Sequence, residues 1–351
     1  MSPQEIPKEM RAIQVIEYKK PYKINTIPVP SSLFPHDILV KVAVASNCHT
    51  DSMVSAGVFG TKLPCTGSHE GSGTVVSVGS EVSDIKVGDR GPENESQYCQ
   101  EIDGMIGVTT HGCFAEYVKA DARCSTKLPD KVSFLSAAPL ACAGRTVWRS
   151  VLQTGLKKGE WICFVGSGGG LGHLGVQFAK ALGLKVVGID ARDEGLALTK
   201  EYGADLVVDA RKGKEANVKE IQDATPGNLG VDASVTLAEA ESAAGLACAV
   251  TRMHGTMIQI AQPDEVKVPF AELIFRNIKI HGSLISSAEE SKSMLDCIAE
   301  HGITVKTNQF HGLDKIEELV EMVHGGKIQG KAVIVVDQEQ LEQEKKIGAK
   351  F

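Results

Sequence analysis

The chain has 351 residues, a formal net charge of −7, and a composition that is 42% hydrophobic and 23% charged. A chain of this length is longer than most domains with a single hydrophobic core, so we expect two domains. The composition is that of an ordinary globular protein. The negative charge, without any cluster of basic residues, excludes nucleic acid and anionic membranes as partners, and no apolar run reaches the roughly 18 residues of a membrane span.

The first residues and the cysteines bear on where the protein works. Met1–Glu5 has neither the basic segment nor the apolar segment of a signal peptide, so we expect none. The nine cysteines are odd in number and scattered, which favours reduced thiols and metal ligation over a disulfide framework. We therefore expect a cytoplasmic protein.

The first part of the chain predicts short strands joined by frequent turns. Residues 11–17, 38–45 and 73–78 are rich in β-branched side chains and are bounded by Pro, Asp or Gly. This half is expected to form a small β-rich domain.

Two segments of that domain carry potential metal ligands among small residues. These are Cys48-His49-Thr50-Asp51 and His69-Glu70, and Cys142 follows in Leu140–Gly144. One imidazole and two thiols supply three protein ligands and leave a fourth position open, which is typical of a catalytic zinc ion. Taken singly, each cysteine is more often a small buried hydrophobic residue, so the prediction rests on the three residues together.

The pattern changes at Trp161. Residues 161–165 are continuously apolar, a glycine-rich segment follows at 166–172, and Leu171, Leu174, Phe178 and Leu182 recur at helical spacing. Five more strands are expected at 185–190, 206–209, 231–235, 256–260 and 278–282, with a helix at 239–251 between two of them. Strands alternating with helices predict a doubly wound parallel sheet.

The glycine-rich segment is placed to bind a dinucleotide, because the start of a helix offers unpaired N–H groups to a pyrophosphate. The strict G-x-G-x-x-G spacing fits Gly170, Gly172 and Gly175, whereas a frame of Ser167, Gly169 and Gly172 puts the turn at the strand end. We prefer the second frame.

Asp190 ends the next predicted strand, where a carboxylate accepts hydrogen bonds from the adenosine ribose hydroxyls. That charge would repel a 2′-phosphate and favours NAD over NADP. Arg192 keeps NADP open, because an arginine nearby can accommodate the phosphate.

The rest of the chain is expected to return to the first domain. Residues 291–300 and 314–323 predict helices and 332–336 a strand, whereas the charged segment 338–346 is expected to be a solvated end. The predicted organisation is a domain at 1–150, a dinucleotide-binding domain at 151–287 and a return at 288–351.

Together these motifs resemble the zinc-dependent medium-chain alcohol dehydrogenases, and most closely the fungal, yeast-type ethanol dehydrogenases. The resemblance covers about residues 10–337 and also rests on Gly88-Asp89-Arg90, Gly188-Ile189-Asp190 and Gly330-Lys331-Ala332-Val333. It implies an α/β protein with a GroES-like β-rich catalytic domain, a Rossmann domain, and a site in the cleft between them. It also implies reversible hydride transfer between a primary alcohol or aldehyde and NAD, and a homo-oligomer, either a dimer or a tetramer.

The resemblance also implies roles for individual residues. Cys48, His69 and Cys142 would ligate one zinc ion, Glu70 would be an occasional extra ligand, and Asp51 would orient His69. Thr50 would bind the substrate hydroxyl and His49 the cofactor pyrophosphate, with Lys331 close to it. The other implied cofactor positions are Gly168, Gly169, Gly170, Leu171, Gly172, Asp190, Ile260, Ser283 and Ile285.

Three departures from the family are visible. The lobe that holds a second, structural zinc with four cysteines is reduced to residues 93–99, where only Cys99 remains. Met53 stands where the family often has the histidine that ends its proton relay. The segment between Asp51 and Lys62 is short, with Ser55 and Phe59 where aromatic residues narrow the pocket, which predicts a roomier substrate site.

Other functions remain open at this point. A polyol or cinnamyl-type zinc dehydrogenase would have the same metal and fold, and a zinc-free quinone or enoyl reductase would have no use for the three ligands. A nucleotide-binding paralogue without catalytic activity is the alternative from another class, because fold alone does not fix function.

Overall fold

A computed structural model describes residues 5–92, 104–326 and 328–350. The chain forms two compact units, Met1–Ala143 with Ser287–Phe351, and Gly144–Ser286. The second unit therefore interrupts the first in sequence. Among the described residues, every helix is too short or too polar to cross a lipid bilayer.

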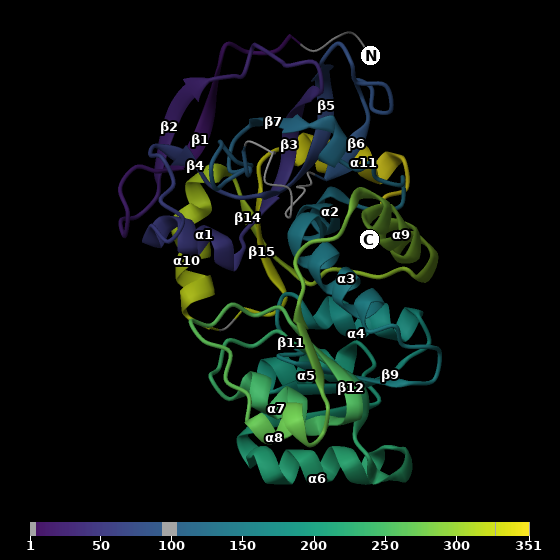
Figure 1. The fold of residues 1–351 in the computed structure, drawn as a ribbon. Helices are drawn as coiled ribbons and strands as arrows, with labels where there is room; N and C mark the ends of the chain where they lie inside the picture. The colour runs from purple at the N-terminus through teal and green to yellow at the C-terminus, as the bar shows by residue number, and fades with distance from the viewer. Residues whose placement is uncertain (1–4, 93–103, 327, 351) are drawn as a thin grey trace. The chain divides into compact units, whose positions relative to one another are not determined.

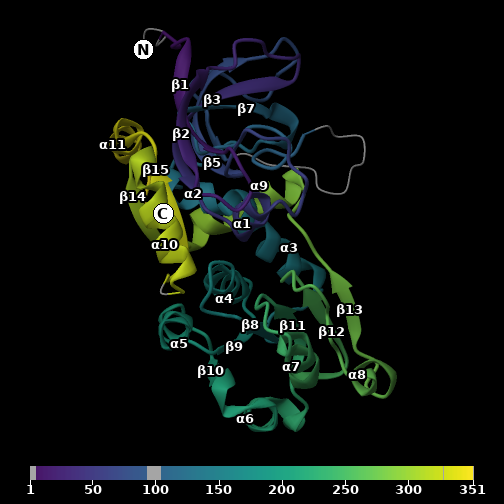
Figure 2. The same cartoon turned by 90° about the vertical axis from the view of Figure 1, so that its left-hand side faces the viewer.

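The second unit is built on a six-stranded parallel sheet (Figure 2). Its strands are β8 (Trp161–Val165), β9 (Lys185–Asp190), β10 (Leu206–Asp209), β11 (Val231–Thr236), β12 (Thr251–Gln259) and β13 (Lys279–Gly282). Its helices are α3 (Arg145–Gln153), α4 (Gly172–Ala181), α5 (Asp193–Glu201), α6 (Lys214–Ala224), α7 (Ala243–Val250) and α8 (Phe270–Ile274). The strand order β10-β9-β8-β11-β12-β13 confirms the predicted doubly wound sheet.

Local sequence explains this sheet well. Central strands covered by helices on both faces need continuous apolar runs, and Ile162–Val165 of β8 are all buried. Two predicted starts were wrong: β12 begins at Thr251 rather than Thr256, and α7 begins at Ala243 rather than Glu239.

The first unit is mostly antiparallel (Figure 1). Its strands are β1 (Glu9–Val15), β2 (Lys23–Pro28), β3 (Asp37–Ser46), β4 (Cys65–Thr66), β5 (Glu70–Val78), β6 (Arg90–Pro92), β7 (Tyr117–Asp121), β14 (Thr307–His311) and β15 (Lys331–Val335). Its helices are α1 (His49–Ala56), α2 (Phe134–Pro139), α9 (Ala288–His301), α10 (Ile316–His324) and α11 (Gln338–Lys346). β3 is central, because it pairs with β5, β7 and β15.

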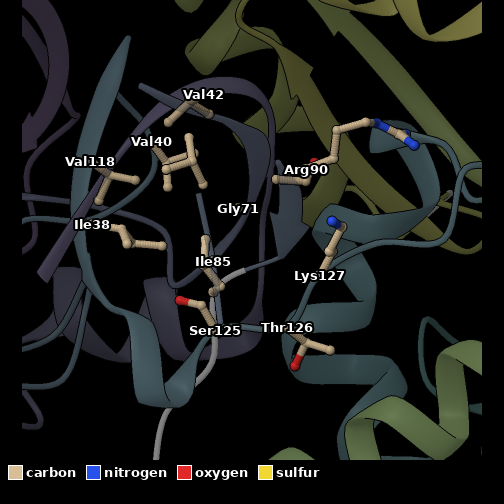
Figure 3. Close-up of a pocket in the computed structure, with 12 residues that line it drawn as sticks. Ile38, Val40, Val42, Gly71, Ile85, Arg90, Val118, Ser125, Thr126 and Lys127 are labelled. Carbon is tan, nitrogen blue, oxygen red and sulfur yellow. The ribbon is translucent and has the colours of Figure 1, made fainter. Parts of the chain in front are cut away.

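The core of the first unit is well filled. A cavity of about 20 Å³ lies among Ile38, Val40 and Val118, which has room for about one water molecule (Figure 3). This cavity is too small for a substrate, so a functional site must be sought elsewhere.

The end of the chain contradicts the prediction of a solvated tail. Residues 338–346 form helix α11, and the carboxylate of Asp337 caps it by accepting the N–H groups of Glu339 and Gln340. Leu341 and Glu344 are buried on its inner face. The prediction failed because the helix buries polar side chains with specific partners, which leaves almost no apolar periodicity to detect.

Candidate metal and dinucleotide sites

Four side chains of the first unit converge on one point. Cys48 precedes α1, His69 precedes β5, Glu70 begins β5, and Cys142 lies in the π-helical turn Leu140–Gly144 that follows α2. One potential ligand atom from each of the four lies within 4.8 Å of the others. The structure thus brings together the three predicted zinc ligands and the predicted occasional ligand Glu70.

Asp51 fixes two of the segments that carry these ligands. It is 1% exposed, and its carboxylate accepts the N–H of Cys48 at 2.9 Å and of Ser68 at 2.7 Å. Asp51 therefore ties the start of α1 to the turn that carries His69. Nδ1 of His69 receives no hydrogen bond from Asp51 among the described residues, and the predicted orienting role of Asp51 stays a prediction.

The turn at His69 is held by a close backbone approach. Ser68 has a left-handed backbone (φ 69°), and its hydroxyl donates to the carbonyl of Ser46 at 2.8 Å. A side chain at Gly112 would place its Cβ only 2.1 Å from the carbonyl oxygen of Ser68. Glycine is therefore required at position 112 for the ligand turn to keep its place.

The donor set fits a zinc ion. Nδ1 of His69 is buried and has no hydrogen-bond partner among the described residues, which is costly unless a further group binds the ring. Two thiols and an imidazole are the ligands that Zn²⁺ prefers.

These side chains also change the pKa values of one another. A hydrogen bond from the thiol of Cys142 lowers the pKa of Cys48 well below its usual value, although burial opposes this. Burial alone would lower the pKa of His69, but the neighbouring Cys48 thiolate raises it to about 10. One thiol of the hydrogen-bonded pair Cys48 and Cys142 is thereby favoured as a thiolate, the form that binds a cation.

Glu70 forms a buried ion pair that the sequence did not reveal. The ammonium of Lys331 lies 2.8 Å from its Oε2 and 3.0 Å from its Oε1, and the N–H of Ala143 donates to Oε1 at 3.3 Å. Burial raises the pKa of Glu70 to about 7 even with Lys331 beside it. No sequence pattern could have paired two residues 261 positions apart.

The remaining predicted residues of this unit lie on α1. Thr50 is half-buried, and its hydroxyl accepts a hydrogen bond from the Cys48 thiol at 3.8 Å. His49 is exposed at the first position of the helix. Met53, at the usual relay position, is half-buried one helical turn further on.

The glycine turn of the second unit follows β8 and leads into α4, which begins at Gly172. Gly166 has a left-handed backbone (φ 93°), and a Cβ at Gly172 would lie 2.2 Å from its carbonyl oxygen. Gly168 is also required, because its Cβ would lie 2.1 Å from Cα of Gly195. The preferred frame correctly placed Gly172 at the helix start, but the turn itself is made at Gly166 rather than at Ser167. Gly169, Gly170 and Leu171 remain partly exposed.

Asp190 lies directly against this turn. Its Oδ2 accepts the N–H of Gly168 at 2.9 Å, and its Oδ1 accepts the N–H groups of Ala191 and Arg192 at 2.9 and 3.0 Å. Nε of Arg192 lies 3.5 Å from Oδ1. A carboxylate and a guanidinium are therefore adjacent at the end of β9.

The other predicted cofactor positions of this unit follow the ends of neighbouring strands. Ile260 comes directly after β12 and Ser283 after β13, and the N–H of Ser283 donates to the carbonyl of Gln259 at 3.1 Å. Ile285 is buried two residues further on. These positions share the carboxyl-terminal edge of the sheet with the glycine turn, which is where such sheets bind ligands.

The segment predicted to replace the structural-zinc lobe, including Cys99, lies outside the described residues. Its predicted loss of three cysteines stays a prediction.

Comparison with known proteins gives consistent matches across the chain. Residues 34–130 match the family model described as the alcohol dehydrogenase GroES-like domain, and residues 170–300 match the zinc-binding dehydrogenase model. Alcohol dehydrogenase 1 of Emericella nidulans is 34% identical over 90% of this chain and 94% of its own length. An alcohol dehydrogenase of Geobacillus stearothermophilus is 33% identical over 93% of this chain and 100% of its own.

A solved structure agrees with these sequence matches. The alcohol dehydrogenase of the archaeon Aeropyrum pernix superposes with a TM-score of 0.84 at 28% identity, over 93% of this chain and 99% of that one.

Proposed function

This chain belongs to the zinc-dependent alcohol dehydrogenase family, and from that premise we propose that it interconverts primary alcohols and aldehydes with NAD as cofactor. The observation that carries the proposal is the convergence of Cys48, His69, Glu70 and Cys142 within 4.8 Å. Because thiolate ligands need reducing surroundings, we place the enzyme in the cytoplasm.

Each residue of the first unit has a proposed task. Cys48, His69 and Cys142 would hold the zinc ion, and Glu70, paired with Lys331, would lie beside it as an occasional extra ligand. When bound, zinc polarises the alcohol oxygen and the nicotinamide ring accepts the hydride. The Thr50 hydroxyl would bind the substrate hydroxyl and take its proton. Met53 cannot carry that proton further, so we propose that water accepts it.

The choice of NAD rests on Asp190. Its carboxylate is 6% exposed and fixed beside the glycine turn, so a 2′-phosphate placed there would meet a negative charge. The remaining proposed cofactor contacts on this unit are Gly168, Gly169, Gly170, Leu171, Gly172, Ile260, Ser283 and Ile285. On the first unit they are His49 and Lys331, for the pyrophosphate, and Thr50.

The proposal is tested by adding NAD and a panel of alcohols to zinc-loaded protein and following the formation of NADH. Turnover of ethanol and longer or branched primary alcohols is expected. A strong preference for polyols or cinnamyl alcohol would assign the enzyme to those dehydrogenases. Nucleotide binding without turnover of any alcohol would instead indicate a paralogue that has lost catalysis.

The short segment between Asp51 and Lys62 gives this panel a sharper expectation. Val58 and Phe59 in that segment are 62% and 42% exposed. We expect kcat/KM for branched primary alcohols to lie within about tenfold of the ethanol value, since one methylene changes pocket binding by roughly 1–3 kcal/mol. A strict preference for ethanol would rule out the roomier site.

We also propose that the enzyme is a homo-oligomer that uses the edge of the second unit's sheet. β13 is the last strand of that sheet, and α8 lies close to it in the chain (Figure 2). Phe270, Ile274 and Phe275, in and next to α8, are 70%, 69% and 69% exposed. An apolar patch beside a strand edge suits pairing with a second copy, because a strand edge is self-complementary across a two-fold axis.

The substitution Ile274→Lys is therefore expected to shift the protein toward the monomer, because it places a charge in the proposed interface. Light scattering after size exclusion measures the mass. Leu229→Lys is the matched control, since Leu229 is 59% exposed elsewhere on the same unit. An unchanged mass for Ile274→Lys would place the interface on another surface.

A further inference from the structure

Glu344 on α11 binds the start of α2. Its carboxylate is 4% exposed and accepts the N–H of Phe134, the first residue of α2, at 2.8 Å to Oε2 and 3.1 Å to Oε1. The last helix of the chain therefore caps α2 with a side chain from outside that helix. A carboxylate at a helix start also interacts favourably with the helix dipole.

Arg90 completes this contact. Its guanidinium donates to Oε2 of Glu344 at 2.5 Å and to the carbonyl of Val132 at 2.6 Å, and it lies 4.4 Å above the ring of Phe134. Both charges are thus buried and mutually compensated. Removing one partner of such a pair leaves the other charge buried without compensation, which is costly.

The helix held in this way leads directly to a zinc ligand. α2 ends at Pro139 and continues without a loop into the π-helical turn that carries Cys142. The hydroxyl of Ser72, on β5, donates to the carbonyl of Phe134 at 2.8 Å. Because α2 is a single short helix, a shift at Phe134 is expected to move the turn at its other end.

α11 is itself firmly attached to the first unit. Asp337, which caps it, pairs with Lys41 of β3 at 2.7 Å, and Gln340 accepts a hydrogen bond from Thr74 of β5 at 2.7 Å. The helix can therefore act as a fixed support for α2, and the position of Glu344 is set by the same sheet that carries Glu70.

We propose that Glu344 is a positioning residue for the zinc ligand Cys142, acting through α2. The proposal rests on the zinc site inferred above. In this arrangement, Glu344 fixes the position of the first residue of α2. The π-helical turn at the other end of α2 then places the Cys142 thiolate beside Cys48 and His69. A loosened α2 would weaken zinc binding without changing any ligand.

The test is the rate at which zinc leaves the protein in the presence of a coloured chelator. Glu344→Gln keeps the shape of the side chain but removes its charge and presents an amide N–H₂ to other donors. We expect zinc release about five- to tenfold faster than from the unsubstituted protein, since residues that orient a ligand typically change metal affinity by about 10- to 100-fold. The absorption bands of the Co²⁺-substituted protein, which report thiolate geometry, are expected to shift as well.

Two controls separate positioning from general loss of stability. Glu342→Gln removes the same charge from an exposed position of α11, where Glu342 accepts hydrogen bonds from Gln338 and Lys345, and should leave zinc release unchanged. Leu319→Ala removes buried volume from the core of the first unit at α10, and should lower the melting temperature without changing zinc release.

The outcomes distinguish this inference from the proposed function. If the unsubstituted protein holds zinc and Glu344→Gln releases it at the same rate, the positioning role is refuted and the zinc site stands. If Leu319→Ala accelerates zinc release as much as Glu344→Gln does, the effect comes from lost stability alone and the inference fails. If the unsubstituted protein retains no zinc, the proposed metal site is wrong and the inference falls with it.

Discussion

Substituting His69 with alanine is expected to lower alcohol oxidation by at least about a thousandfold while the protein stays folded. The imidazole is one of three proposed protein ligands, and its loss leaves two thiols that cannot complete the site. The fold should persist, because the core of the first unit is an extended apolar cluster that excludes His69. Zinc content and the rate of NADH formation measure the effect, and circular dichroism reports the fold.

His36→Ala is the matched control for this experiment. His36 is a surface residue whose ring pairs with Glu81 at 3.2 Å, so its loss should change neither zinc content nor turnover. Removing zinc from the unsubstituted protein with a chelator should reproduce the His69→Ala result, and adding zinc back should restore activity. Full turnover by metal-free protein would overturn the metal-dependent mechanism.

The second large effect is expected at Asp190, where alanine should reverse the preference between the two dinucleotides. The substitution removes the acceptors for the ribose hydroxyls, which should lower kcat/KM with NAD by about a hundredfold. It also removes the charge that repels a 2′-phosphate and frees the guanidinium of Arg192, now 3.5 Å from that carboxylate, to bind it. The ratio of kcat/KM for NADP to that for NAD is expected to rise on the order of a thousandfold.

The double variant Asp190→Ala with Arg192→Ala identifies the source of this gain. If Arg192 binds the phosphate, the double variant should lose about tenfold of the new NADP activity and little of the remaining NAD activity. Asp190→Ala also leaves the N–H of Gly168 without its acceptor, so melting temperatures must be compared first. Equal NADP activity in both variants would show that Arg192 does not contribute.

Local patterns in the sequence were sufficient to predict much of the fold. The apolar run of β8, the glycine turn and the residues of α4 follow one another directly, so their arrangement depends on neighbours in the chain. The convergence of Cys48, His69 and Cys142 could also be predicted, because two cysteines and a histidine in small-residue segments have few chemical uses in a chain that also carries a dinucleotide-binding pattern.

Long-range polar contacts could not be predicted in the same way. The pairing of Glu70 with Lys331 and of Arg90 with Glu344 joins segments that are brought together only by the folded sheet. The same holds for Asp51, whose two carboxylate oxygens accept backbone N–H groups that no side-chain pattern reveals.

The first unit is made of two chain segments with the second unit between them, so its two parts are synthesised at different times. Cys48, His69 and Cys142 are all synthesised before the second unit, whereas β15, which pairs with β3, is synthesised only near the end. Domains generally fold as units while they are synthesised. A chain truncated after residue 286 would therefore contain every proposed zinc-binding thiol and imidazole, yet lack both Lys331 and Glu344. Such a product would expose the unpaired side of β3 and is expected to be removed by proteolysis or to aggregate rather than to persist as a partly active enzyme.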